Sequence, residues 1–265
     1  MEKMKYSKKK VYDHLADYKE HRLGIKRNGK WKRNGREYPH ILPCDQTEAN
    51  LIDCGYLHDL QELKSNPSVK LHAGFHHLNS SQALAFNLMV PIQCEKMYAT
   101  LFSLIGKNDD VEQFYFEHID DEAESTNFDF FIKSKSSKYY FELKYTEDRF
   151  GSAKNDPRHN QKYQTIYKNR LERIAGVDKN EFFQNYQFWR NMIYTKNGIV
   201  VFVLPKFRKD ILDEIELAKE KMFNTGNVKI LFIDDLCLNL INCRNEKIAA
   251  HYREFYGKYL DIQDI

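Results

Sequence analysis

The sequence lacks the features that mark membrane, secreted and nucleotide-driven proteins. It has no apolar run of transmembrane length, and its basic start is not followed by the apolar stretch of a secretory signal. The 5 cysteines are odd in number and form no Cys-x-x-Cys pair, a pattern typical of free thiols in a reducing compartment. We therefore expect a cytoplasmic protein that makes no membrane contact.

Motifs for several other classes are also missing. The chain has no Gly-x-Ser-x-Gly sequence of a serine hydrolase, and no Gly-rich phosphate loop, so we expect no nucleotide cofactor. His72 and His76 have the spacing of two zinc ligands on one helix face. No matching cysteine or histidine cluster accompanies them, and we do not expect zinc.

Positive charge is concentrated near the start of the chain. The whole sequence of 265 residues has a net charge of +3, but residues 1–40 contain 13 Lys or Arg against 5 Asp or Glu. Residues 26–36 combine basic side chains with a tryptophan and two Asn-Gly turns. Such an arm can neutralise phosphates and stack on a base, although a solubilising tail or hairpin remains open. The candidate DNA contacts in this arm are Lys26, Arg27, Trp31, Lys32 and Arg33.

Two acidic residues and a lysine lie inside two apolar segments. Asp129 is surrounded by phenylalanines, and Glu142 and Lys144 follow in a run of aromatic residues after a short polar link. Burying such charges costs several kcal/mol unless a counter-charge compensates them. Because side chains alternate along a strand, Glu142 and Lys144 share one face, and pairing the two strands can bring Asp129 beside Glu142. The alternative is a solvated surface hairpin with an ordinary Glu–Lys pair.

These residues resemble the PD-(D/E)XK nuclease superfamily, and the wider pattern resembles restriction-endonuclease-like bacterial proteins. Asp129 followed by Glu142-Leu143-Lys144 matches the superfamily motif, with Asn127-Phe128-Asp129 in place of its proline-aspartate half. The resemblance covers roughly residues 72–240. Further segments that contribute to it are His76 to Ala83, Phe116-Glu117, Thr126 to Asp129 and Phe141 to Glu147 with Phe150-Gly151.

The resemblance implies a metal-dependent nuclease and a set of site residues. Asp129, Glu142 and the backbone carbonyl of Leu143 would hold Mg²⁺, for which Mn²⁺ can substitute, and Lys144 would orient a water or stabilise charge on the phosphate. Glu117 is a candidate for the same metal shell, with a solvent-facing glutamate as the alternative. Gln82 is a further catalytic candidate, with a structural amide hydrogen bond as the alternative.

Other residues are candidates for contacts with DNA. Lys162 and Tyr163 begin a segment of basic residues and tyrosines, which can also be a plain helix face. Gln187 and Arg190 are three apart on a helix face and resemble a Gln-x-x-Arg pattern near the site of the same group. Residues 120–124 are interpreted as an acidic loop.

Hydrophobic patterning predicts an α/β fold with a restriction-endonuclease-like core, in which helices flank a mixed central sheet. The element order is αβββαβ, preceded by an N-terminal helical extension. We expect a basic extension over residues 1–75, a nuclease core over 76–240 and a C-terminal helical tail over 241–265. The expected strands cover residues 111–118, 127–132, 138–145, 199–204 and 229–233; the expected helices include 81–105, kinked at Pro91, 179–197 and 210–223.

The function that follows is a Mg²⁺-dependent endodeoxyribonuclease, most simply of the restriction type. A repair or recombination nuclease acting on branched or single-stranded DNA is one alternative, and a non-catalytic DNA-binding module is another. DNA is the expected partner, and a homodimer is compatible with the resemblance.

Overall fold

The computed structural model describes residues 7–263, and the chain divides into two compact units. The first unit comprises residues up to 108, 204–207 and those from 232 on, and the second comprises residues 109–203 and 208–231. This division does not coincide with the boundaries expected at residues 75 and 240. As a division of function, those boundaries stay a prediction.

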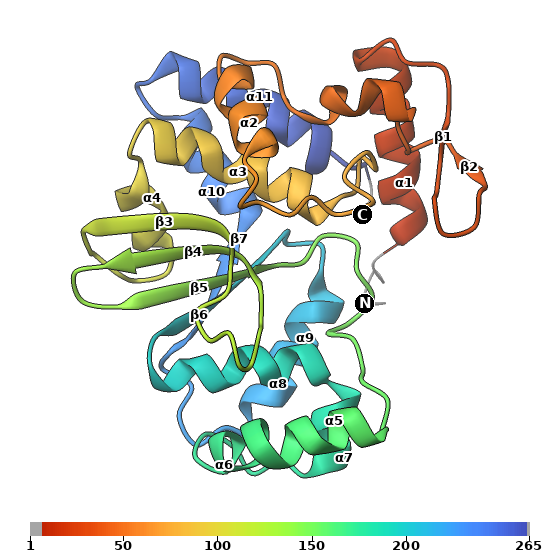
Figure 1. Cartoon of the computed structure of the whole chain (residues 1–265). Helices are drawn as coiled ribbons and strands as arrows, with labels where there is room; N and C mark the ends of the chain where they lie inside the picture. Colours follow the sequence, from red (N-terminus) through yellow and green to blue (C-terminus); the bar gives the residue numbers. More distant parts are fainter. Residues whose placement is uncertain (1–6, 264–265) are drawn as a thin grey trace, which may run out of the picture. The chain divides into compact units, whose positions relative to one another are not determined.

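The second unit is built on a five-stranded sheet with the strand order β3-β4-β5-β6-β7 (Figure 1). Strand β4 pairs antiparallel with both β3 and β5, whereas β5 pairs parallel with β6. The expectation of an α/β fold with a mixed sheet is therefore confirmed. The strands cover Val111–His118 (β3), Phe128–Ser134 (β4), Lys138–Leu143 (β5), Ile199–Leu204 (β6) and Val228–Phe232 (β7).

The strand sequences explain the order of the sheet. All six residues of β6 are buried and apolar, as expected of a parallel strand covered on both faces. Strands β4 and β5 are joined by a short polar link that Ser134 closes, because its hydroxyl donates to the carbonyl of Ser137 over 2.9 Å. Aromatic pairs lock the register of these two strands, with Phe130 stacked on Phe141 at 4.2 Å.

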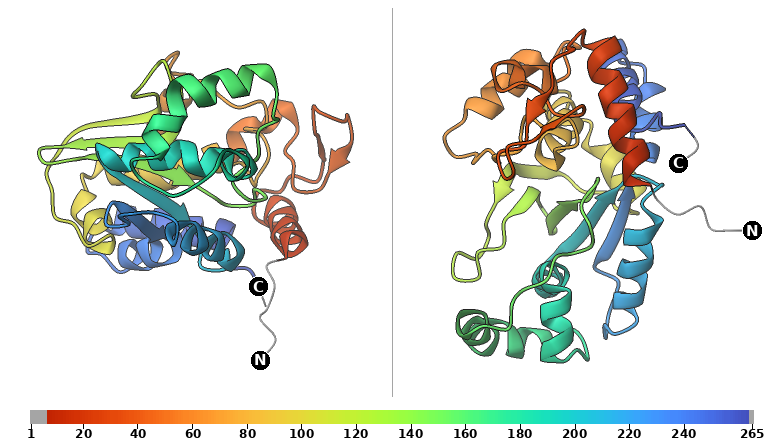
Figure 2. Two further views of the ribbon diagram at one scale, coloured as in Figure 1. Left: turned by 90° about the horizontal axis from the view of Figure 1, so that it is seen from below. Right: turned by 90° about the vertical axis from the view of Figure 1, so that its right-hand side faces the viewer.

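Most helices of the second unit lie between β5 and β6 in the sequence, and in space they form one group (Figure 2). The helix expected over residues 179–197 is interrupted at Asn185, whose φ of −121° is not helical. Phe188 stacks on Phe202 of β6 at 5.5 Å, so the group packs against the sheet. Its members are α5 Pro157–Lys162, η3 Tyr163–Tyr167, α6 Lys168–Leu171, α7 Lys179–Gln184, α8 Tyr186–Met192 and η4 Ile193–Lys196; α9 Lys209–Lys219 follows β6.

The first unit is mainly helical and carries a small hairpin. The two-stranded hairpin pairs β1 Gly29–Lys30 with β2 Glu37–Tyr38, as the Asn-Gly turns indicated. None of the helices in residues 7–263 is long and apolar enough to cross a membrane. The helices are α1 Lys8–Asp17, η1 Tyr18–Arg22, η2 Cys44–Asn50, α2 Leu57–Ser65, α3 Ser81–Cys94, α4 Tyr98–Leu104, α10 Ile233–Ile241 and α11 Glu246–Tyr259.

The long helix expected over residues 81–105 is wrong in one respect, because it is two helices. Ser80 caps α3, since its hydroxyl accepts from the backbone N–H of Ala83 over 3.3 Å. Pro91 lies inside α3 and does not end it. The chain turns instead at Lys96, which takes a left-handed conformation with φ of +54° before α4 begins.

A buried lysine stands at the centre of the first unit. Lys258 on α11 is fully buried, and its Nζ donates to the backbone carbonyl and to the side-chain Oδ1 of Asn50, over 2.7 and 2.9 Å. Asn87 of α3 donates to the same backbone carbonyl over 2.9 Å. The lysine thus joins α11 to the segment that precedes α2. Burial lowers the pKa of Lys258 to about 7.

This lysine predicts a pH-dependent stability. Between pH 7 and about 10.5 the unfolded chain holds a proton that folded Lys258 has lost, so the free energy of unfolding should rise with pH. Below pH 7 the buried charge imposes its full cost, of a few kcal/mol at about 1.4 kcal/mol per pKa unit. In urea unfolding, the free energy of unfolding of wild type relative to that of Lys258→Met should be larger at pH 9 than at pH 7. The exposed control Lys247→Met should differ from wild type by the same free energy at both pH values. If the difference between wild type and Lys258→Met is also the same at both pH values, the prediction is contradicted.

Candidate active site

Strands β4 and β5 bring the two predicted carboxylates together. The register pairs Phe130 with Phe141, so the next positions along the strands, Asp129 and Glu142, face each other. Asp129 Oδ2 accepts the backbone N–H of Leu143 over 2.6 Å. Glu142 is only 4 % exposed and Asp129 is half-buried. The alternative of a solvated surface hairpin is therefore wrong.

Lys144 and Gln187 complete a closed set of polar contacts with Glu142. The Nζ of Lys144 lies 3.2 Å from Glu142 Oε1 and donates to Gln187 Oε1 over 2.6 Å. Gln187 Nε2 in turn donates to Glu142 Oε1 over 2.6 Å. The lysine is 3 % exposed and lies 5.2 Å from the centre of the Phe150 ring. The side-chain amide of Gln187 on α8 thus fixes the positions of both the Glu142 carboxylate and the Lys144 amine.

The electrostatics of the pair are unfavourable without a further positive charge. Burial and then the neighbouring Glu142 carboxylate raise the pKa of Asp129 well above its ordinary value, and the hydrogen bond from Leu143 only partly opposes this. Burial also raises the pKa of Glu142, against the opposing charge of Lys144. Both carboxylates are therefore held where their charged forms are disfavoured, which makes the pair a candidate functional site.

Glu117 lies close to this pair on the neighbouring strand. The register pairs Phe116 with Phe130 and His118 with Phe128, so Glu117 lies opposite Asp129. Its carboxylate accepts a hydrogen bond from Asn127 and adds to the repulsion that raises the pKa of Asp129. Its backbone has φ of +53°, in the left-handed region that non-glycine residues adopt only uncommonly.

Gln82 belongs to the first unit, where its side chain is buried. Its Oε1 accepts the backbone N–H of His72 over 2.8 Å, and its Nε2 donates to the carbonyl of Lys70 over 3.0 Å. These contacts are the structural amide hydrogen bonds named as the alternative. A catalytic role for Gln82 stays a prediction.

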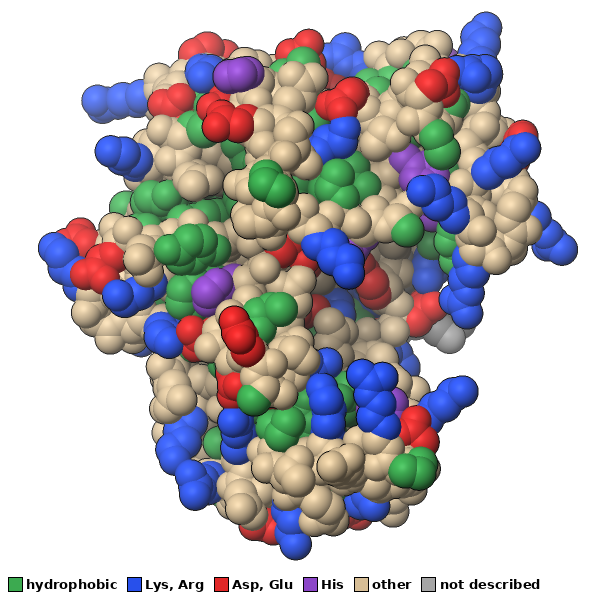
Figure 3. Space-filling model, viewed as in Figure 1, with side chains coloured by type: hydrophobic (Ala, Val, Ile, Leu, Met, Phe, Trp, Pro, Cys, Tyr) green, Lys and Arg blue, Asp and Glu red, His purple; other side chains and the backbone are tan. Residues whose placement is uncertain are grey.

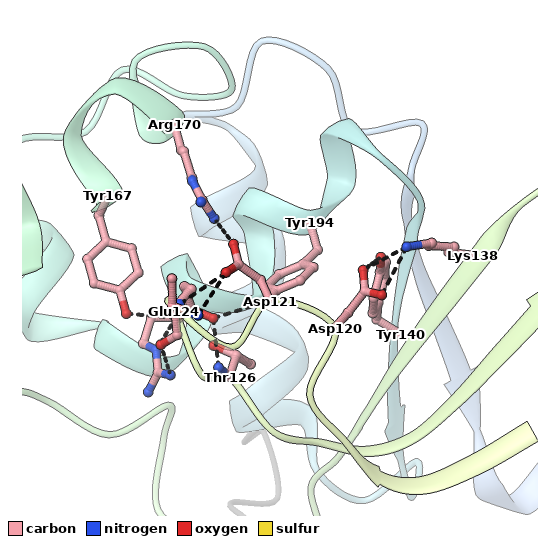
Figure 4. Close-up of polar contacts among 11 residues, drawn as sticks. Asp120, Asp121, Glu124, Thr126, Lys138, Tyr140, Tyr167, Arg170 and Tyr194 are labelled. Atoms are coloured by element: carbon pink, nitrogen blue, oxygen red, sulfur yellow. Dashed lines mark hydrogen bonds and ion pairs between the residues drawn. The ribbon is translucent and has the colours of Figure 1, made fainter. Parts of the chain in front are cut away.

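The interpretation of residues 120–124 as an acidic loop is wrong for Glu124. This side chain is fully buried and accepts from four residues, of which Figure 4 labels Thr126, Tyr167 and Tyr194. Although burial alone would raise the pKa of Glu124, the charge of Arg190 and the hydrogen bonds from Thr126 and Tyr167 outweigh it, and the pKa is lowered. The contacts to Glu124 come from Arg190 Nε at 2.7 Å, Tyr167 Oη at 2.7 Å, Tyr194 Oη at 2.9 Å and the Thr126 N–H at 2.7 Å.

The sequence reading missed this buried cluster, although a signal was present. Tyr186, Arg190 and Tyr194 recur every four residues, which places three polar groups along one side of a helical stretch. A stripe of this kind needs a polar partner when it is buried. Nothing in the sequence shows that Glu124 is that partner.

The other predicted DNA contacts of the second unit occupy different surroundings. Tyr163 is buried, and its ring packs against Phe182 at 5.3 Å and Phe183 at 5.9 Å. Lys162 is half-buried at the end of α5. The guanidinium of Arg190 is held by Glu124, so gripping a phosphate would require that ion pair to open. Contact of these residues and of Gln187 with DNA stays a prediction.

A pocket of about 560 Å³ lies beside the Glu124 cluster and away from the carboxylate pair. Neither Asp129, Glu142 nor Lys144 lines it. The ion pair between Arg170 and Asp121, 2.7 Å long, spans part of its wall (Figure 4). Three carboxylates and three cations line the pocket, so its formal charge favours neither an anion nor a cation.

The fold and the site together define a class of protein. A five-stranded mixed sheet flanked by helices, with an acid pair on two adjacent strands, is consistent with a restriction-endonuclease-like protein. The sequence matches the family described as "Restriction Endonuclease associating with ARP" over residues 13–260, and the chain belongs to this family. No curated protein and no solved structure matches the chain. The expectation of a restriction-endonuclease-like family is thereby confirmed.

Proposed function

We propose that this protein is a Mg²⁺-dependent endodeoxyribonuclease of the PD-(D/E)XK superfamily that hydrolyses DNA phosphodiester bonds, in a restriction-type role. The observation that carries the proposal is the pairing of Asp129 with Glu142 across β4 and β5, with the amine of Lys144 3.2 Å from Glu142. Membership of a restriction endonuclease family supports it. The family description also names an association with ARP, so a partner of that name belongs to the proposal.

The residues present fit a small divalent cation. The carboxylates of Asp129 and Glu142 and the carbonyl of Leu143 are oxygen donors, which Mg²⁺ and Mn²⁺ prefer, and Glu117 can add a fourth oxygen. In residues 7–263 no three His, Cys, Asp or Glu side chains are grouped as a ready metal site. The Leu143 carbonyl enters the proposed set through the resemblance to the superfamily. When bound, the cation would act as a Lewis acid toward the phosphate and acidify a water.

The protein's own groups have separate tasks in this proposal. Lys144 supplies a fixed positive charge next to the position where negative charge develops on the phosphate. Gln187 holds this amine and the Glu142 carboxylate in one geometry, because its amide bonds to both. Burial of the lysine and the glutamate keeps bulk water from screening their charges.

Cleavage is expected to depend on the metal. Purified protein should nick and linearise plasmid DNA with Mg²⁺ or Mn²⁺, and activity should stop with excess chelator. Restoring the cation should restore it. Equal cleavage in excess chelator would contradict the mechanism, while binding without cleavage under all metals would favour the DNA-binding module named among the alternatives.

A further inference from the structure

The tip of the β1–β2 hairpin, residues 31–36, has a fixed shape. The Trp31 N–H donates to the Arg36 carbonyl over 2.8 Å, and the Gly35 N–H donates to the Trp31 carbonyl over 2.8 Å. Gly35 has φ of +69°, which only glycine adopts without strain. The side chain of Asn34 bonds to Tyr38 Oη over 2.8 Å and accepts the Arg36 N–H over 3.0 Å. Four hydrogen bonds therefore set the positions from which the tip side chains project.

The base of the hairpin is fastened to the first unit. Gly29 donates to the Ile41 carbonyl over 2.8 Å, and a Cβ at this glycine would meet the Leu42 carbonyl oxygen at 2.0 Å. Lys19 is 2 % exposed, and its ammonium donates to the carbonyl of Arg27, in the segment that leads into the hairpin, over 2.9 Å. The hairpin is thus held rigidly where it leaves the unit.

The tip carries uncompensated positive charge. Lys32, Arg33 and Arg36 are all exposed, and within residues 7–263 their charged side-chain groups form no ion pair and no hydrogen bond. Nearby cations differ, since Arg27 pairs with Asp45 and Lys30 lies 3.9 Å from Glu37. Figure 3 shows Lys and Arg side chains projecting into solvent over the region of the hairpin. A rigid element with three free cations is suited to a polyanion.

Trp31 anchors this charged tip. Its ring meets Tyr38 at 6.0 Å and His77 at 6.5 Å, both nearly edge to face, and it is 38 % exposed. Proteins that bind single strands present open aromatic faces to successive bases. Here the indole is engaged by two rings of its own unit, which favours contact with phosphates over stacking on a base.

We propose that the hairpin tip binds the phosphate backbone of duplex DNA through Lys32, Arg33 and Arg36, while Trp31 holds the tip in shape. A duplex suits this surface because it presents about one negative charge per 1.7 Å of axis on a regular backbone. The proposal rests on the proposed function only for its choice of DNA as the polyanion. Arg36 enters as a contact that the sequence did not single out.

The test is DNA binding in chelator, where cleavage cannot interfere. Wild type and a Lys32→Gln, Arg33→Gln, Arg36→Gln triple variant are titrated with a fluorescent duplex and with its single strand at several salt concentrations. Each lost phosphate contact should lower the slope of log affinity against log salt by about 0.9, so the triple variant should lose about 2 to 3 in slope on the duplex. Arg253→Gln removes an exposed arginine that is paired with Glu246 in the same unit, and should bind like wild type.

Two outcomes would overturn the proposal, provided that circular dichroism shows the variants folded. One is a duplex salt slope unchanged in the triple variant. The other is a Trp31→Ala loss of tenfold or more on single strands with no change on the duplex, with Trp31→Phe retaining binding, which would indicate base stacking. A failure of the proposed nuclease activity can be told apart from a failure of this inference. If wild type binds the duplex through the tip but never cleaves it with Mg²⁺, the nuclease proposal is wrong and the inference about the tip still holds.

Discussion

Replacing Asp129 by Asn or Glu142 by Gln should abolish DNA cleavage and leave the protein folded and able to bind DNA. Each change keeps the shape of the side chain and removes one of the two charges that the site is built to hold. Loss of one preorganised electrostatic group at a reacting centre typically costs about 100- to 1000-fold in rate. Single-turnover cleavage of a labelled duplex with Mg²⁺ measures the loss directly.

Asp129→Asn should also be more stable than wild type, whereas Glu142→Gln leaves the buried Lys144 amine without its carboxylate and should not be. Burial raises the pKa of both carboxylates, so the folded state carries charges that it disfavours. Removing the charge of Asp129 relieves that cost. The melting temperature of Asp129→Asn should therefore rise while the cleavage rate falls. This combination is expected for a functional site and not for a structural ion pair.

A matched control is available on the neighbouring strand. Glu112 of β3 is 42 % exposed and pairs with Lys133 at 3.4 Å, so Glu112→Gln removes a carboxylate from the same sheet without touching the site. It should cleave like wild type. Wild-type turnover in Glu142→Gln would show that the catalytic site lies elsewhere.

The sheet and its carboxylate pair could be predicted because both depend on local pattern. Short apolar runs separated by polar links marked the strands, and the link between β4 and β5 was short enough to fix their antiparallel register. Once that register is set, Asp129 must face Glu142. The strand boundaries accordingly agree with the expected ones to within two residues.

What could not be predicted depends on residues that are distant in the sequence. Gln187 was assigned to DNA, whereas its amide joins Glu142 and Lys144, 45 and 43 residues away. The break of the expected helix at Asn185 has no proline or glycine to announce it. Local propensity cannot show which of several acids will be drawn into the interior by tertiary contacts.

Glu124 is the acid that tertiary contacts bury most completely, and Glu124→Ala should destabilise the second unit severely. The change would strand the Arg190 guanidinium, two tyrosine hydroxyls and the Thr126 N–H around a site that is fully buried. Removing one partner of a buried ion pair typically costs about 3–5 kcal/mol, because the remaining charge is left uncompensated. Urea unfolding followed by tyrosine and tryptophan fluorescence measures the difference.

Glu122→Ala provides the control for this experiment, because Glu122 lies two residues away in the same loop and is exposed. Its free energy of unfolding should stay within about 0.5 kcal/mol of wild type. The double variant Glu124→Gln, Arg190→Met should recover part of the loss, since neither charge is then stranded. Equal stability of the Glu124→Ala and Glu122→Ala proteins would show that the buried cluster contributes nothing.

The pH dependence of the same variants tests the electrostatic origin of the effect. The pKa of Glu124 is lowered in the folded state, so its contribution to stability is present above the ordinary carboxyl pKa and is lost as the pH falls through the lowered value. Wild type should therefore lose stability in acid more steeply than Glu124→Gln, which keeps a hydrogen-bond acceptor but has no charge to titrate. Because α8 carries both Arg190 and Gln187, an acid-weakened cluster should also loosen the amide that holds Lys144. Parallel stability curves for the two proteins from pH 7 to pH 3 would assign the stabilisation by Glu124 to packing and not to its charge.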